Sequence, residues 1–303
     1  MILAIAVPIM VQNGITNFVS MIDNIMVGRV GTNEMSGVAI VNQLIMVFNL
    51  CIFGGVAGAG IFTAQFHGAR NTEGIRYTFR YKIIVVAIIT VLSIAIFLGF
   101  GEELIRLYLH GESGVEDAIA GTLHNAKVYL SVMLIGLPPF AISQAYGDTL
   151  RCSEETIVPM KAGVVSVVVN LSLNYVLIYG KLGATALGVA GAAIATIIAR
   201  YVEMVYVVVW THTHSKRQPF INGAFRGFKI PLSLAKDMLA KGMPLILNET
   251  LWSMGVAALL QNYSVRGLAV VGALNISQII SNLFNVGIIA MGNAISIILG
   301  RRL

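Results

Sequence analysis

Charged residues are scarce in this 303-residue sequence. They make up 11% of it, whereas a soluble domain of this length carries roughly 25%. Hydrophobic residues reach 57%, and the mean hydropathy is +0.82. This composition excludes an ordinary soluble domain and indicates a protein whose solvent is the lipid bilayer. The net charge of +6 does not indicate a nucleic-acid partner, because the basic residues lie between apolar stretches and are sorted to one side.

Cysteine is also nearly absent, and the residues of common catalytic sites do not gather. Cys51 lies inside an apolar stretch and Cys152 in a short polar segment, so no disulfide framework is implied. The five histidines show no ligand constellation, and no nucleophile, base and orienting group occur together. We therefore expect no metal centre, no bound cofactor and no enzyme activity.

Long apolar runs, by contrast, are abundant. A helix needs about 20 apolar residues to cross the hydrocarbon core. Eight runs qualify: 2–27, 36–65, 82–100, 127–149, 156–180, 186–211, 238–262 and 267–299. They show no period-two alternation, which favours helices over barrel strands. We predict an all-α, polytopic membrane protein.

The basic residues predict the orientation of these helices. Of the 20 Lys and Arg residues, 14 lie in the connections 66–82, 150–161 and 212–241 or at the end of the chain. The positive-inside rule places these segments and both ends in the cytoplasm, in a multi-pass protein of the cell membrane. Asp148 and Glu203 fall near the predicted cytoplasmic ends of their helices, and we expect them to be surface groups.

The beginning of the chain recurs roughly 236 residues later. Two sets of residues match across this interval: Leu3, Ala4 and Pro8 with Leu239, Ala240 and Pro244, and Asn49, Ile52 and Ile61 with Asn285, Ile288 and Ile297. Duplicated spanning helices are typical of secondary transporters, which bind substrate where the repeats meet. We predict a six-helix N-lobe over 1–211, a cytoplasmic linker over 212–237, and the first two helices of a C-lobe over 238–303, with the chain truncated after the eighth helix.

Asp23 is the most informative single residue, a carboxylate late in the first apolar run. At membrane depth a carboxylate costs roughly 2.5–3.5 kcal/mol and therefore usually faces a bundle interior or a water-filled cavity. Ser20 and Thr16 precede it on the same helical face as further oxygen ligands. Burial disfavours the charged form, which suits a group that takes up and releases a proton. The alternative is a solvated residue near the outer interface.

Three more polar residues lie within spans. Glu249 in the seventh run occupies the place equivalent to Asn13, and it is either a second functional acid or a structural Glu that bonds a neighbouring helix. Asn170 and Asn174 lie four apart, so their amides share one helical face and can supply oxygens to a cation or hold a carboxylate. They can equally serve as interhelical hydrogen bonds, worth about 0.6 kcal/mol each.

A polar stripe in the eighth run has counterparts in the second. The spacing of three and four residues along this stripe indicates a face turned to a partner helix or to a cavity, and the sequence does not separate the two. We predict a lining surface formed by Asn13, Gln43, Asn275, Gln278 and Asn282.

Several segments, read together, resemble one known family. They are Phe18–Gly31 in the first run, Val158–Met160 and Asn170–Gly180 in the fifth, Gly188–Thr196 in the sixth, and Asn248-Glu249 with Trp252 in the seventh. Each looks like the corresponding segment of the multidrug and toxic compound extrusion (MATE) transporters, and the resemblance extends over essentially the whole chain.

The resemblance implies twelve helices in two six-helix lobes that exchange cytoplasmic drugs for external Na⁺ or H⁺. The family's first-helix acid falls on Asp23, its fifth-helix Asn and acid on Asn170 and Asn174, its sixth-helix Thr on Thr196, and its seventh-helix acid on Glu249. Position 174 is Asn here, where some members have Asp. The resemblance thus makes Asp23, Asn170, Asn174 and Thr196 the cation-binding set, with Glu249 as the substrate or cation residue of the C-lobe.

The combined prediction is a Na⁺- or H⁺-coupled antiporter without a cofactor. It would export drugs or other amphipathic organic cations, with membrane lipid rather than nucleic acid around it. Two alternatives stay open. A lipid-linked oligosaccharide flippase of the same superfamily needs a strongly basic central cavity, and only Arg200 lies deep in a span. The other alternative is a truncated remnant that does not transport.

Overall fold

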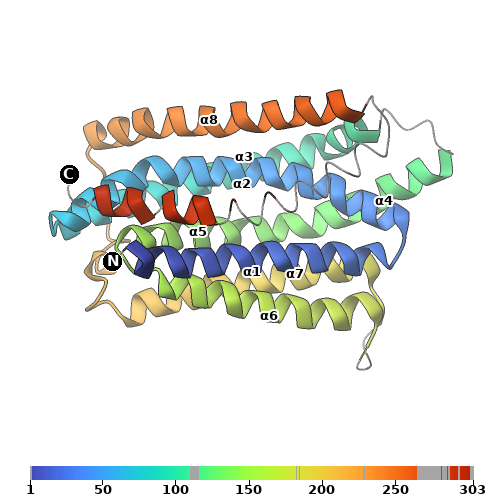
Figure 1. The fold of residues 1–303 in the computed structure, drawn as a ribbon, viewed down its shortest axis with the longest axis horizontal. Helices are drawn as coiled ribbons and strands as arrows, with labels where there is room; N and C mark the ends of the chain where they lie inside the picture. Colours follow the sequence, from blue (N-terminus) through green and yellow to red (C-terminus); the bar gives the residue numbers. More distant parts are fainter. Residues whose placement is uncertain are drawn as a thin grey trace.

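The structure is a computed structural model that describes residues 2–109, 116–181, 183, 185–227, 229–264, 281, 285, 287–292 and 294–300. Long helices lie side by side along one axis (Figure 1). Within the described ranges the chain is helical and contains no strand, which confirms the predicted all-α class.

The first seven predicted apolar runs correspond to helical chain. The elements are α1 (Ile2–Gly28), α2 (Thr32–Gly68), α3 (Thr72–Leu109), α4 (Glu116–Met133), η1 (Leu134–Gly136), α5 (Leu137–Cys152), α6 (Ile157–Tyr179), α7 (Gly188–Thr213), η2 (Pro219–Ile221) and α8 (Leu232–Ser264). The described part of the last run, 287–292 and 294–300, is also helical.

The fourth run is broken in the middle rather than continuous. The 3₁₀ turn η1 separates α4 from α5, and Pro138 and Pro139 begin α5. Proline supplies no backbone N–H and disfavours continuation of the preceding helix. A break at membrane depth is tolerated where protein surrounds it, and here Arg200 Nη1 of α7 donates to the Gly136 carbonyl oxygen at 3.1 Å.

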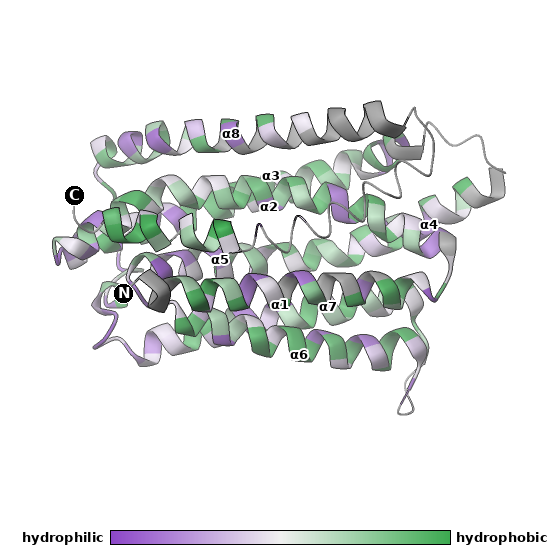
Figure 2. Cartoon of the chain, in the orientation of Figure 1, coloured by the Kyte–Doolittle hydropathy of each residue, from purple (hydrophilic) through white to green (hydrophobic). Residues whose placement is uncertain are grey.

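The outer surface of the bundle is apolar. Five stretches in the described part are long and apolar enough to cross a membrane: Asn33–Gly68, Thr72–Leu107, Ile119–Cys152, Ile157–Tyr179 and Gly188–Thr213. Along α3, Val91 is 66% and Leu98 is 71% exposed, and hydrophobic colouring dominates the middle of the helices (Figure 2). Large apolar side chains in such positions are stable only against lipid, so the chain is a multi-pass membrane protein.

Three of the apolar clusters in the described part of the bundle interior follow one another along its length. One lies around Val41 and Tyr129, a second around Phe48 and Leu137, and a third around Phe79 and the 3₁₀ turn η2. Contacts among α2, α3, α5, α6 and α7 therefore run over the full height of the bundle. These helices form a fixed frame for the polar residues between them.

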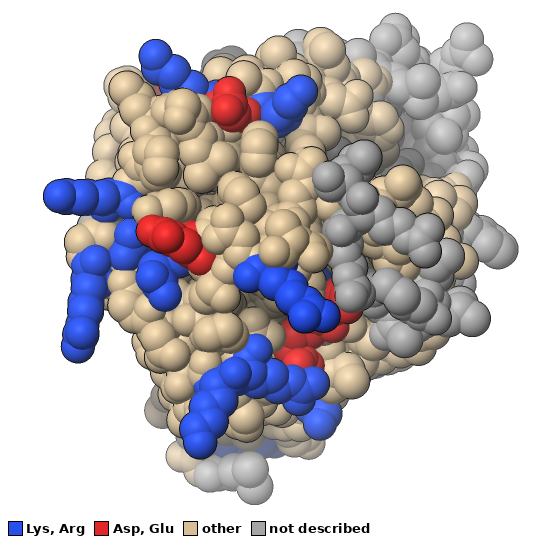
Figure 3. Space-filling model, turned by 90° about the vertical axis from the view of Figure 1, so that its left-hand side faces the viewer, with Lys and Arg blue, Asp and Glu red and all other residues tan. Residues whose placement is uncertain are grey.

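The two predicted repeats touch at one end of the bundle. Ala6 and Ile9 of α1 pack against Ala290 and Ala294 of the last helical segment, and α2 packs against α8. We call this the basic end: α1 and α8 begin there, and α2 and α7 end there (Figure 1). Lys and Arg side chains are spread over this face (Figure 3).

Candidate functional site

Asp23 is joined directly to the fifth-span amides. It is half-buried near the end of α1, and Asn174 of α6 donates from Nδ2 to its Oδ1 at 2.7 Å. The same Nδ2 donates to Asn170 Oδ1 at 3.2 Å. Both amide protons are therefore used, while the buried Asn174 Oδ1 has no hydrogen-bond partner. A charge-assisted bond of this length is among the stronger ones in a protein.

Asn170 extends the cluster to α7. Its Nδ2 donates to Thr196 Oγ1 at 3.3 Å, and Thr196 donates to the Ala192 carbonyl at 3.0 Å. With the Asn170 amide turned over, its nitrogen lies 3.0 Å from Oδ2 and 3.1 Å from Oδ1 of Asp23. One amide orientation thus presents a donor to the carboxylate, and the other presents an oxygen beside it.

Helix packing explains how these side chains meet. Asn170 and Asn174 are four residues apart on α6 and share one face, and both are almost fully buried. At the end of the bundle opposite the basic end, Tyr179 ties α6 to α1, because its hydroxyl donates to the Met26 carbonyl at 3.0 Å. All four members of the cation-binding set predicted from the resemblance therefore lie in one connected cluster.

The other predicted site residues lie elsewhere. Asn13 is half-buried on α1, and Gln43 is exposed on α2. Glu249 lies on α8, but its side chain is outside the described residues, as are the side chains of Thr16 and Ser20. Asn275, Gln278 and Asn282 are also outside them. The lining surface and the C-lobe acid stay predictions.

Arg200 is engaged within the bundle. Besides its bond to Gly136, its guanidinium carbon lies 5.0 Å from the Phe140 ring centroid. Glu203, one turn further along α7, is only partly exposed, and the Ser143 side chain hydrogen-bonds it. The expectation that Glu203 is a surface group is therefore wrong. The described residues also hold no group of three His, Cys, Asp or Glu side chains that could bind a metal ion.

Two polar features were missed by the sequence argument. Lys82, assigned to a loop, is fully buried in α3 and pairs at 2.7 Å with Asp148, which was expected to be a surface group. Arg80 of α3 donates to four carbonyls of the connection between α7 and α8, at Gly223, Ala224, Arg226 and Lys229. The available signal was the position of Lys82 at the edge of a long apolar run.

A bundle of membrane-length helices with an acid and three polar side chains joined inside it is the architecture of a polytopic membrane transporter. The family model MatE matches residues 8–176, more than half of the sequence. The chain belongs to this family of multidrug and toxic compound extrusion transporters.

Individual relatives agree with this assignment. The "Probable multidrug resistance protein NorM" of Thermotoga maritima is 28% identical over 257 residues, 84% of this chain and 52% of that protein. "Multidrug resistance protein MdtK" of Edwardsiella ictaluri is 26% identical over all of this chain and 64% of its own length. The chain thus spans about half to two thirds of the curated relatives it matches. None of these relatives is described as an enzyme.

Solved structures share the fold. One described as the outward-facing conformation of a multidrug resistance MATE family transporter matches with a TM-score of 0.85 and 24% identity, over 99% of this chain and 65% of that one. A MATE in the bent conformation matches with a TM-score of 0.82 over 97% of this chain and 62% of its own. At this identity the likeness concerns the fold.

Proposed function

We propose that the chain is the part of a cation-coupled drug exporter that binds the coupling ion. Asp23 would bind Na⁺ or H⁺, and the ion would be exchanged for an amphipathic organic compound leaving the cytoplasm. The observation that carries this proposal is the cluster of Asp23 with Asn174, Asn170 and Thr196 inside the N-terminal helices.

The chemistry of the cluster suits a small cation. Carboxylate, amide and hydroxyl oxygens are the ligands that hard cations prefer, and the buried Asn174 Oδ1 has no other partner. The Asn170 amide can offer either a donor or an acceptor to the site, because it carries both a nitrogen and an oxygen. An amide nitrogen would bond the ion-free carboxylate, and an amide oxygen would join the carboxylate around a bound cation.

The proposal of drug export is supported by sequence similarity to known proteins. The relatives named above are called multidrug resistance proteins, and we propose the same class of substrate here. Binding of the ion to Asp23 would favour the arrangement of the helices that binds the ion more tightly, because an ion shifts an equilibrium only by its difference in affinity for the two states. No described feature favours the flippase alternative, since Arg200 bonds Gly136 and stacks over Phe140.

Ethidium efflux from cells that express the protein tests the proposal. We expect Asp23→Asn to abolish efflux while membrane abundance is unchanged, and Asp23→Glu to retain part of it, because Glu keeps the charge but displaces it by one methylene. Glu103→Gln removes an exposed acid near the end of α3. It is the matched control and should behave like the unmodified protein. Unchanged efflux in Asp23→Asn would overturn the assignment.

Transport by the purified 303-residue chain in liposomes tests the remaining alternative. Exchange of ethidium against an inward Na⁺ or H⁺ gradient would exclude a non-transporting remnant. If neither the unmodified chain nor Asp23→Asn exchanges ethidium, although both are folded and inserted, the result would favour the remnant.

A further inference from the structure

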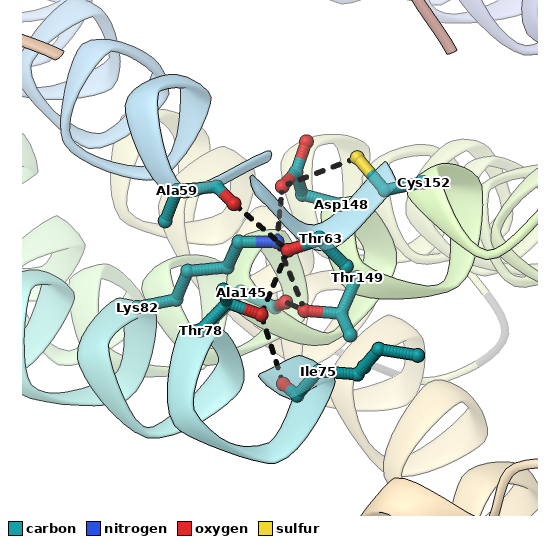
Figure 4. Close-up of polar contacts among 9 residues, drawn as sticks. All are labelled: Ala59, Thr63, Ile75, Thr78, Lys82, Ala145, Asp148, Thr149 and Cys152. Carbon is teal, nitrogen blue, oxygen red and sulfur yellow. Dashed lines mark hydrogen bonds and ion pairs between the residues drawn. The ribbon is translucent and has the colours of Figure 1, made fainter. Parts of the chain in front are cut away.

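A buried ion pair joins three helices near the basic end. Lys82 of α3 is fully buried, and its Nζ lies 2.7 Å from Asp148 Oδ2, 2.9 Å from Thr63 Oγ1 and 3.2 Å from Thr149 Oγ1 (Figure 4). Thr63 lies on α2, and the other two partners lie on α5. An ammonium has three donors, so each one has a partner. A buried pair is tolerated only when its remaining donors are satisfied in this way.

The cluster holds α2 in particular. The hydroxyls of Thr63 and Thr78 lie 2.9 Å apart, which adds a second tie from α2 to α3. Asp148 lies close to the backbone of α2 at Gly60, because a Cβ added at Gly60 would be 3.3 Å from Asp148 Oδ2. We call Lys82, Asp148 and Thr63 the brace, because together they fix one face of α2 to its neighbours.

The opposite face of α2 meets the second repeat. Gly58 is two residues from Gly60 and therefore points to the other side of the helix, since successive residues are about 100° apart. A Cβ added at Gly58 would lie 2.5 Å from Gly242 Cα of α8, so the two backbones touch. Ala64 lies one helical turn beyond Gly60 and also contacts the second repeat, because a Cβ added at Gly300 would lie 3.0 Å from Ala64 Cβ.

Among the described residues, this contact is tightest at the basic end. Along the helical row of α2 that contains Gly58, Gly54 is buried, Cys51 is half-buried, Val47 is 55% exposed and Gln43 is exposed. On α8, Met238 and Gly242 are buried, whereas Leu245 is 38% exposed. At these described positions, the facing surfaces are covered near the basic end and more accessible farther from it.

We infer that the contact of α2 with the second repeat is the closure of the basic end, and that Lys82, Asp148 and Thr63 are positioning residues that hold α2 in place for it. The inference rests on the proposed function, because exchange across a membrane requires one end to close while the other opens. Without its tie to Lys82, α2 can move off Gly242 and Gly300, and the closed arrangement becomes less populated.

Thr63 and Thr149 provide a matched test. Each hydroxyl bonds the same ammonium, but only Thr63 belongs to α2. Thr63→Val and Thr149→Val each remove one hydroxyl at nearly constant volume and leave the ion pair intact. The closure is reported by a cysteine pair at Ala64 and Gly300, which are close enough to be bridged. The native Cys51 and Cys152 are replaced by Ser and Ala, and oxidation is followed by counting the thiols left for PEG-maleimide.

We expect Thr63→Val to slow cross-linking about ten-fold or more, because it removes the hydrogen bonds to Lys82 and to Thr78, and Thr149→Val to leave the rate unchanged. Equal rates in the two variants would show a static core cluster and overturn the inference. Asp148→Asn, which removes the charge that pairs with Lys82, should also slow cross-linking. Asp148→Glu, which keeps the charge, should restore the cross-linking rate.

The functional consequence is tested with the same cysteine pair. Oxidised Ala64→Cys/Gly300→Cys protein should stop ethidium efflux, and a reductant should restore it; continued efflux after complete cross-linking would contradict a closure that must open. The cross-linking rates need no transport activity. A failure of the proposed function would therefore appear as no efflux before oxidation, separately from a failure of the closure.

Discussion

At the scale of single residues, Asn174 connects the candidate site. Its one amide nitrogen bonds both Asp23 Oδ1 and Asn170 Oδ1, and it is 1% exposed. A buried carboxylate without a donor loses its main compensation for desolvation. The side chain therefore contributes to folding as well as to the proposed binding of the ion.

Replacing Asn174 by Ala should lower the free energy of unfolding by about 1–3 kcal/mol, because it leaves buried oxygens unsatisfied. Denaturation in mixed detergent micelles measures the difference. Ser172→Ala on the same helix is the control, since that hydroxyl bonds only the Val168 carbonyl in an exposed position, and it should change stability by less than about 0.5 kcal/mol. Equal losses in the two variants would mean that the cluster is not a stabilising unit.

At the scale of elements, the close packing of α6 against α7 supports the site. α6 and α7 approach so closely that a Cβ at Gly191 would lie 2.6 Å from the Leu177 carbonyl oxygen. Small residues allow such approach between membrane helices, where van der Waals packing drives association. The Asn170–Thr196 bond depends on this approach, because its two ends belong to these two helices.

Gly191→Leu should therefore separate α6 from α7 and destabilise the protein by about 1–3 kcal/mol or more, as overpacking against backbone does. Gly99→Leu on α3 is the matched change, because no atom lies within 4 Å of a Cβ added there. The amount of folded protein recovered from membranes compares the two. Normal recovery of the Gly191 variant would show that the helices can repack without loss.

At the scale of the whole molecule, charge is unevenly distributed between the two ends. The connections at the basic end hold most of the Lys and Arg residues, and Figure 3 shows them over that face. The opposite end carries Arg106 and Lys127, both engaged by Glu102. The positive-inside rule then predicts that the basic end faces the cytoplasm.

Cysteine labelling in intact cells tests this orientation. Lys181→Cys, exposed at the opposite end, should react with a membrane-impermeant maleimide added outside. Lys229→Cys, exposed at the basic end, should react only after the cells are opened. Both variants are made without Cys51 and Cys152. The reverse pattern would place the basic end outside and would reverse the predicted direction of export.

The sequence determined the helices and the membrane class of this protein. The first seven predicted apolar runs and the described part of the eighth are helical, because the requirement for about 20 apolar residues is local and needs no knowledge of neighbours. It also singled out Asp23, since a carboxylate within an apolar run has few stable environments. The break at η1 was not predicted, although Pro138 and Pro139 mark it.

Only the tertiary structure decided which polar groups meet. Asp23 and Asn174 are 151 residues apart, and the pairing of Lys82 with Asp148 reversed two expectations that position along the chain had suggested. The contact of Gly58 with Gly242 likewise joins helices of the two predicted repeats. The physical reason is that periodicity fixes the face on which a residue lies, whereas its partner depends on which helices pack together and at what height.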